Sequence, residues 1–200
     1  SFFSAAAEDM AIPAVALAAV KNSTPLKHDV CAAIDNLCKT DSRTTLWQDK
    51  KEPGIVWAIT SEPALLRITH AQNTYHVSAI WSFKDYLFHD NEVADNDNRL
   101  ARQPAEIHPA FYPLSATKKA VALVDKWTVG YAGGGMEQHY ADFLMLNDDG
   151  TWVPVLRDID FFATEVIKIC QAEATKNPEH CRDEFWRMLQ LRITDTGEEA

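Results

Sequence analysis

The chain has 200 residues, 46% of them hydrophobic, and its 29 acidic residues outnumber 19 lysines and arginines to give a net charge of −10. This length and composition are typical of a chain that folds around a buried core and is not disordered. The negative charge disfavours binding to nucleic acid or to anionic lipid. No apolar run approaches the roughly 20 residues that a membrane-spanning helix needs. We therefore expect one domain over 1–200, with no nucleic-acid partner and no insertion into a membrane.

The N-terminal segment 1–40 is predicted to be helical. Residues 5–21 are rich in alanine and predict a first helix. That helix should end before Pro25, which is expected in the first turn of a second helix with Ser23 or Thr24 as its N-cap. In the second helix, apolar residues at helical spacing predict a core-facing stripe: Leu26, Val30, Ile34 and Leu37.

From residue 55 onward, apolar residues alternate with polar ones, which is typical of half-buried strands. The expected strands span 55–60, 65–70, 77–83, 121–131, 140–146, 152–156, 164–170 and 185–193, although the last segment could instead be helical. Strands joined by tight turns form antiparallel meanders, and these predict one twisted sheet of about seven or eight strands over 55–194. The fold class is therefore predicted to be α+β, with two meanders and the two N-terminal helices packed on one face.

Residues 85–117 are predicted to be a long loop, since acids and amides are followed by Pro104, Pro109 and Pro113. Loops of this length inside a compact domain are uncommon and often functional. Oxygen-rich side chains there raise the possibility of a calcium site, with these candidate residues: Asp85, His89, Asp90, Glu92, Asp95, Asp97 and His108. The order of residues 95–99 lacks the glycine and the later glutamate of an EF-hand. A solvated loop is the preferred interpretation, and no metal site is predicted.

Residues 133–139 form the strongest candidate site. Gly133, Gly134 and Gly135 would allow backbone N–H groups to approach a ligand closely. Glu137 and His139 are two residues apart, so in a strand they would point to the same face and could transfer protons to one ligand. The alternative is a wide hairpin connection with solvated polar residues. We expect these five residues to bind a ligand, and Glu137 and His139 are the only candidates for catalysis.

Other catalytic patterns are weak in this sequence. His70, His76 and His139 could form a zinc site if their strands were neighbours, but nothing in their spacing brings them together. The chain has no Gly-x-Ser-x-Gly motif. No cofactor is predicted.

Four cysteines fall into two local pairs, which favours disulfide bonds and an oxidising compartment. Cys170 and Cys181 are separated by ten residues that contain a turn signal. Cys31 and Cys38 are harder to join, because seven residues of continuous helix would place their Cα atoms about 10 Å apart. A Cys31–Cys38 bridge therefore requires the helix to end or bend near Ile34; otherwise these cysteines pair differently or stay reduced. We predict both disulfides and a periplasmic or secreted location.

Three functional classes remain open. The first is an exported binding or protein-interaction domain, for example one that inhibits a partner protein with a basic surface. The second is a hydrolase or metal-dependent enzyme that uses Glu137 and His139. The third is a structural subunit that assembles through exposed strand edges. We favour the first class, because the charge is acidic and no motif specifies a reaction.

Overall fold

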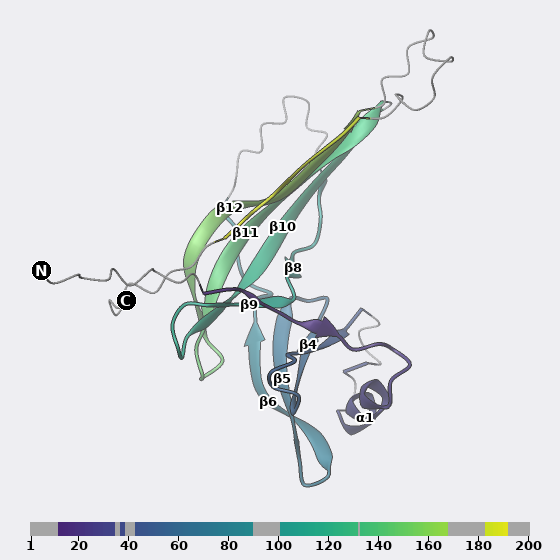
Figure 1. The fold of residues 1–200 in the computed structure, drawn as a ribbon, viewed down its shortest axis with the longest axis vertical. Helices are drawn as coiled ribbons and strands as arrows, with labels where there is room; N and C mark the ends of the chain where they lie inside the picture. Colours follow the sequence, from purple (N-terminus) through teal and green to yellow (C-terminus); the bar gives the residue numbers. More distant parts are fainter. Residues whose placement is uncertain are drawn as a thin grey trace, which may run out of the picture.

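The computed structural model describes residues 12–34, 37–38, 43–89, 101–131, 133–167 and 183–191. Across these residues the chain is built from strands, and α1 (Pro25–Ala33) is the one helix among them. The strands form two antiparallel sheets (Figure 1). The predicted α+β fold, with one sheet and two N-terminal helices, is therefore wrong, and the chain is mostly β.

The smaller sheet has five strands in the order β2-β3-β4-β5-β6. Their bounds are β2 (Ala18–Ala19), β3 (Thr45–Gln48), β4 (Ile55–Ile59), β5 (Ala64–Ala71) and β6 (Thr74–Ser82). Between β5 and β6, Gln72 and Asn73 both have positive φ values, of 52° and 62°. Two-residue hairpin turns of this kind match the twist of the strands that they join.

The larger sheet has eight strands along the path β1-β9-β10-β11-β12-β13, and β7 and β8 also pair with β10. Their bounds are β1 (Val15–Ala16), β7 (Ala101–Arg102), β8 (Glu106–Ile107), β9 (Ala110–Pro113), β10 (Lys119–Tyr131), β11 (Gly134–Leu146), β12 (Trp152–Ile167) and β13 (Asp183–Met188). The predicted loop 85–117 thus contains three short strands. β12 is one long strand where the sequence predicted two, and β13 is a strand and not the alternative helix.

The N-terminal segment is the clearest correction to the sequence prediction. Within the predicted helix 5–21, β1 pairs with β9 of the larger sheet and β2 pairs with β3 of the smaller sheet. Between them, Leu17 is buried and its backbone N–H donates to the carbonyl of Pro109 at 3.0 Å. Alanine has the highest helix propensity, but propensity is a weak determinant of structure, and pairing with two sheets overrides it here. This segment therefore links the two sheets.

The main core lies between the two sheets. Its buried residues are Leu17, Trp57, Ile59, Leu65, Trp81, Phe83, Ile107, Phe111, Val121, Leu123, Leu144 and Leu146. Two indoles at its margin connect the sheets through hydrogen bonds. The Nε1 of Trp81 donates to the carbonyl of Asn147 at 2.7 Å, and the Nε1 of Trp152 donates to the carbonyl of Ser82 at 2.8 Å. These bonds fix the position of one sheet on the other.

Helix α1 packs against the smaller sheet through a second core, which includes Val30, Leu46, Val56 and Ile68. Thr24 caps the helix, because its hydroxyl accepts from the N–H of Lys27 at 3.4 Å, and Pro25 lies in the first turn as predicted. The helix ends at Ala33, and Ile34 adopts an extended conformation. No helix in the described ranges is both long and apolar enough to cross a membrane.

Cys31 and Cys38 form a disulfide, with their Cα atoms 5.6 Å apart. The bridge closes because the helix ends before Ile34, so the condition stated from the sequence is confirmed. Disulfides persist in oxidising compartments, and this bond therefore indicates such an environment. The predicted Cys170–Cys181 pair lies outside the described residues.

The outer half of the larger sheet projects from the rest of the molecule (Figure 1). We call this part the arm; it comprises 126–131 of β10, 134–140 of β11, 160–167 of β12, and β13. None of the side chains described there is buried, whereas residues 120–125 of the same strand β10 are all buried. We call the remainder of the two sheets, with α1, the body.

β12 bends where it passes from the body to the arm. Asp158 has a positive φ of 57°, and its backbone N–H donates to the carboxylate of the buried Asp142 at 2.7 Å. The hydroxyl of Tyr86 donates to the other oxygen of the same carboxylate at 2.5 Å. Hydrogen bonds to both oxygens satisfy a carboxylate that burial would otherwise penalise. Asp142 therefore fixes the bend.

Candidate functional site

A groove of about 800 Å³ lies where the smaller sheet meets the base of the arm. The smaller sheet and the turns beside it contribute Arg43, Thr45, Trp47, Ile59, Thr60 and Ser61. The larger sheet contributes residues 103–107, Pro109, Lys126, Thr128 and Glu137. We call this feature the inter-sheet groove. Its walls come from segments far apart in the chain, so packing of the two sheets creates it.

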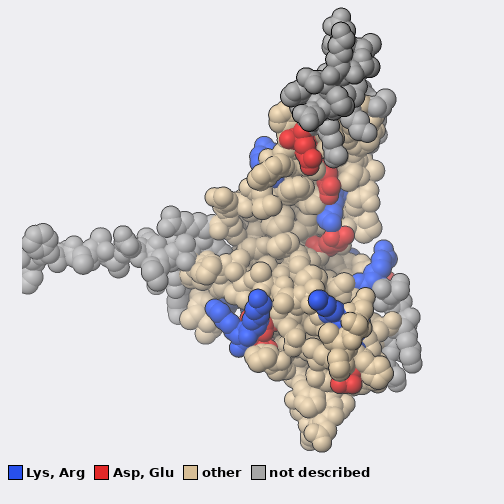
Figure 2. All heavy atoms as spheres, turned by 45° about the vertical axis from the view of Figure 1, so that its right-hand side comes forward, with Lys and Arg blue, Asp and Glu red and all other residues tan. Residues whose placement is uncertain are grey.

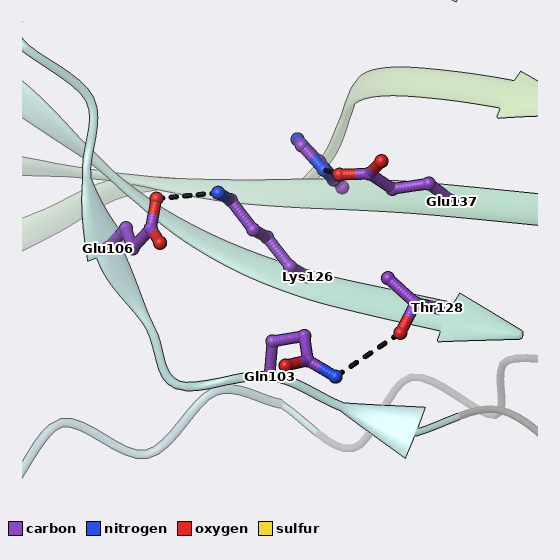
Figure 3. Close-up of polar contacts among 6 residues, drawn as sticks. Gln103, Glu106, Lys126, Thr128 and Glu137 are labelled. Carbon is purple, nitrogen blue, oxygen red and sulfur yellow. Dashed lines mark hydrogen bonds and ion pairs between the residues drawn. The ribbon is translucent and has the colours of Figure 1, made fainter.

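Two side-chain contacts hold one wall of the groove against β10 (Figure 3). The amide of Gln103 donates to the hydroxyl of Thr128 at 3.2 Å, and the ammonium of Lys126 lies 2.5 Å from the carboxylate of Glu106. Since the Glu106 side chain is 62% exposed, this ion pair adds little to stability. Its main effect is to orient Lys126 and Glu106 along the wall.

The structure brings Glu137 and His139 together on one face of β11, as their spacing predicted. The Nε2 atom of His139 lies 2.5 Å from the Oε1 atom of Glu137. The His139 side chain is 14% exposed and packs beside the ring of Phe162, with the ring centroids 5.2 Å apart, whereas that of Glu137 is 39% exposed. His139 therefore supports Glu137 from the less exposed side, and Glu137 lines the groove.

The strand register extends this surface across the arm. Glu137 lies between Thr128 of β10 and Thr164 of β12, and Thr164 in turn pairs with Trp186 of β13. Cross-strand partners lie on the same face of a sheet. A row of polar groups therefore runs from the groove toward Trp186, which is 70% exposed.

Charges of both signs surround the site. On the face drawn in Figure 2, acidic and basic side chains lie among one another. In the groove, Arg43 and Lys126 are basic, while Glu106 and Glu137 are acidic. The groove therefore has no strong electrostatic potential of one sign, and individual side chains must orient a ligand there.

The three glycines lie apart from the groove. Gly133 is in the turn before β11, and Gly134 and Gly135 begin that strand at the tip of the β10–β11 hairpin. A Cβ atom on Gly134 would overlap the carbonyl group of Val166 in β12. Gly134 therefore allows β11 and β12 to approach closely. Ligand binding by the glycines remains a prediction.

The other sequence candidates are dispersed. His70 and His76 lie in the smaller sheet, where the ring of His76 hydrogen-bonds to the hydroxyl of Thr69 at 3.1 Å. Within the described part of the chain, no three His, Cys, Asp or Glu side chains are grouped to hold a metal. Four of the calcium candidates lie outside the described residues: Asp90, Glu92, Asp95 and Asp97.

Sequence reasoning missed a buried carboxylate in β10. Asp125 is 2% exposed and accepts from the Nε of Arg102 at 2.7 Å and from the Nε1 of Trp127 at 3.0 Å. The Arg102 guanidinium also lies over the rings of Phe88 and Trp127, at 5.3 and 5.4 Å from their centroids. An aspartate within an apolar strand is a signal of such a cluster, because a buried charge requires partners. The cluster fixes β7 and the chain near Phe88 beside β10.

Comparisons with protein-family models, with curated proteins and with solved structures found no match to this chain. The chemistry of the groove is therefore the basis for a functional conclusion. Its polar side chains offer both hydrogen-bond donors and acceptors, Trp47 and Ile59 offer apolar surface, and Glu137 with His139 offers a fixed carboxylate.

Proposed function

We propose that this chain is an extracytoplasmic binding domain, periplasmic or secreted, which holds an extended basic segment of a partner protein in the inter-sheet groove. The carboxylate of Glu137 is the main observation in support. His139 contacts its Oε1 atom, while its Oε2 atom has no hydrogen bond to any described residue. A lysine or arginine of a partner would donate a charge-assisted hydrogen bond to the Oε2 atom, and such bonds are stronger than neutral ones.

The size and lining of the groove support a peptide ligand. Its volume of about 800 Å³ is within the range of small-molecule sites, so it can hold several side chains of a bound segment. Apolar contacts with Trp47 and Ile59 would hold side chains of the segment, and the amide of Gln103 would reach its backbone. Protein-binding surfaces combine an apolar centre with polar groups in this way.

The Cys31–Cys38 disulfide supports the proposed compartment. Thiols in the cytosol are kept reduced, whereas exported proteins retain such bonds. The bond also joins the end of α1 to the segment that carries Leu37, which packs in the core beneath the smaller sheet. A partner bound by this domain would therefore be an exported or extracellular protein.

A hydrolase is the second candidate, and the same pair of residues favours it. A carboxylate beside an imidazole can act as a general base on a bound ligand. The two candidates differ in outcome, since a binding domain returns its ligand intact and a hydrolase does not.

The proposal can be tested with two pools of fluorescent decapeptides, one alternating lysine or arginine with apolar residues and one with glutamate in place of the basic residues. The basic pool should bind, binding should weaken as salt rises, and Glu137→Gln should raise the Kd at least about tenfold. Glu137→Gln keeps the size of the side chain and an oxygen for His139. Fluorescence anisotropy gives the Kd, and mass spectrometry detects cleavage.

The matched control is Glu52→Gln, which removes a charge from the exposed turn between β3 and β4 without touching the groove. This variant should bind the basic pool as the parent chain does. Equal binding of both pools, or full binding by Glu137→Gln, would contradict a basic ligand at Glu137. Peptide cleavage that Glu137→Gln abolishes would establish the hydrolase instead.

A further inference from the structure

Two parts of one sheet edge differ sharply in the larger sheet. In the described part of the chain, β13 is the last strand and pairs only with β12, at residues 162–167. The earlier part of β12, from Trp152 to Asp160, pairs only with β11, so it forms the rest of the same edge. Unpaired edges expose backbone N–H and C=O groups that another strand can bind.

The β12 part of the edge carries several features that oppose pairing. Pro154 has no backbone N–H, the register shifts on both sides of the pair Phe143–Leu156, and Asp158 has a positive φ. Arg157 adds an exposed charge. Proline, bulges and charges are the usual means by which proteins protect a sheet edge.

β13 has none of these backbone irregularities. Three of its side chains are largely exposed: Phe185 at 59%, Trp186 at 70% and Met188 at 63%. No proline, positive φ or register shift interrupts the strand. Glu184 and Arg187 are also exposed, so β13 carries charge as well as apolar side chains. A regular edge strand with exposed aromatic side chains is nevertheless suited to pairing with another strand.

We propose that β13 pairs antiparallel with β13 of a second copy of this chain, about a two-fold axis at Trp186. Such an axis stands perpendicular to the sheet, so paired residues lie on the same face and differ by an even number of positions. Trp186 then faces Trp186 of the second copy, and Phe185 faces Arg187 twice. Aromatic pairs and a guanidinium against a ring both stabilise such contacts.

The position of β13 allows this pairing. It lies on the arm, which stands clear of the body in Figure 1, and the pairing would join two arms into one continuous sheet. The guanidinium of Arg187 lies 3.4 Å from the carboxylate of Asp160 in β12, and its side chain is 66% exposed, so it can also contact a ring of the new strand. The inter-sheet groove lies at the base of the arm, so the dimer and the proposed peptide ligand use separate surfaces.

Sedimentation equilibrium tests the proposal on the full chain. The parent chain should form a dimer at concentrations up to about 1 mM, and Phe185→Lys should raise the dimer Kd at least about tenfold, because a new lysine faces Arg187 twice. Val153→Lys is the matched control, since Val153 is 45% exposed on the protected part of the edge. It should leave the Kd unchanged. Circular dichroism verifies that each variant is folded.

A mixed sample tests the register. Arg187→Glu alone should also weaken the dimer, because a carboxylate would then face the ring of Phe185. When Phe185→Lys and Arg187→Glu are mixed, the new lysine faces the new glutamate and the heterodimer should recover to within about tenfold of the parent Kd. A parent chain that stays monomeric, an equal effect of Val153→Lys, or no recovery on mixing would overturn the proposal.

Discussion

The body and the arm share the strands β10 and β11, yet these strands have opposite environments in the two regions. In the body, residues 120–125 of β10 and 141–144 of β11 are buried, alternately in the core between the sheets and in a cluster on the other face of the larger sheet. In the arm, the same two strands continue with every described side chain at least partly exposed. A single pair of strands therefore serves as core at one end and as surface at the other.

This difference separates stability from function. Burial of apolar surface is the main source of folding stability. The body holds the two cores described above and a third buried cluster in the larger sheet, which includes Tyr112 and Phe143. A sheet without a covered face depends on backbone hydrogen bonds between strands and on cross-strand side-chain pairs, which contribute less to folding stability than a buried core does. The arm thus presents its side chains to partners while the body keeps them in place. Glu137 lies close to the boundary, where a rigid base meets an accessible surface.

Two truncations on one face of β10 should give the largest contrast. Leu123 is fully buried in the body, and Val129 is half-buried in the arm on the same face. Leu123→Ala should lower the free energy of unfolding by about 3–4 kcal/mol, because it leaves a cavity in the core. Val129→Ala should lower it by about 1 kcal/mol or less. Urea unfolding measures both, and similar losses would mean that the arm is covered in solution.

The regular parts of the fold could be predicted from the sequence. Alternation of apolar and polar residues located most of the long strands, and Thr24 with Pro25 located the start of α1. The failures occurred where pairing overrides local preference, as in the alanine-rich segment around Leu17. They also occurred in the proline-rich segment of short strands, where Pro113 is the last residue of β9. These short strands form because they pair with β10, and the local sequence pattern does not show that pairing.

The candidate site could be predicted only in part. The two-residue spacing of Glu137 and His139 placed them correctly on one face, because the period of a strand is fixed. The rest of the groove comes from Trp47 of the smaller sheet and from Gln103 beside β10, which are distant in the chain and line one groove only when the sheets pack. Sequence spacing cannot show such a meeting. The contact between Arg102 and Asp125 was missed for the same reason.

Removal of the disulfide in the body should lower the free energy of unfolding by an amount smaller than that for Leu123→Ala. It should leave peptide binding at the arm unchanged. Cys31→Ser with Cys38→Ser should lower the free energy of unfolding by about 2–2.5 kcal/mol, because the unfolded chain regains the freedom of a short loop. The arm has no contact with this bond, so binding of the basic peptides at Glu137 should be unchanged in the folded variant. Urea unfolding and anisotropy measure the two quantities. If the variant is fully folded but no longer binds the peptides, the groove depends on the position of α1.

The smallest expected effect concerns His108, on the outer face of the body. Burial lowers the pKa of His108, whose ring lies 5.0 Å from that of Phe161 and hydrogen-bonds to the Tyr112 hydroxyl at 2.9 Å. The unfolded chain then binds a proton more readily than the folded chain. The contribution of His108 to stability is complete above pH 6.5 and is lost as the pH falls through the lowered pKa.

Since His108 is only part-buried, the loss should be about 1 kcal/mol or less. Urea unfolding at pH 7.5 and at pH 5 should therefore show a larger fall in stability for the parent chain than for His108→Gln, which keeps a polar group but does not titrate. Glu137 and His139 stay intact in this variant, so peptide binding at pH 7.5 should match the parent. An equal fall in both proteins would place the pH dependence elsewhere and would mean that water reaches His108 as freely as it reaches the side chains of the arm.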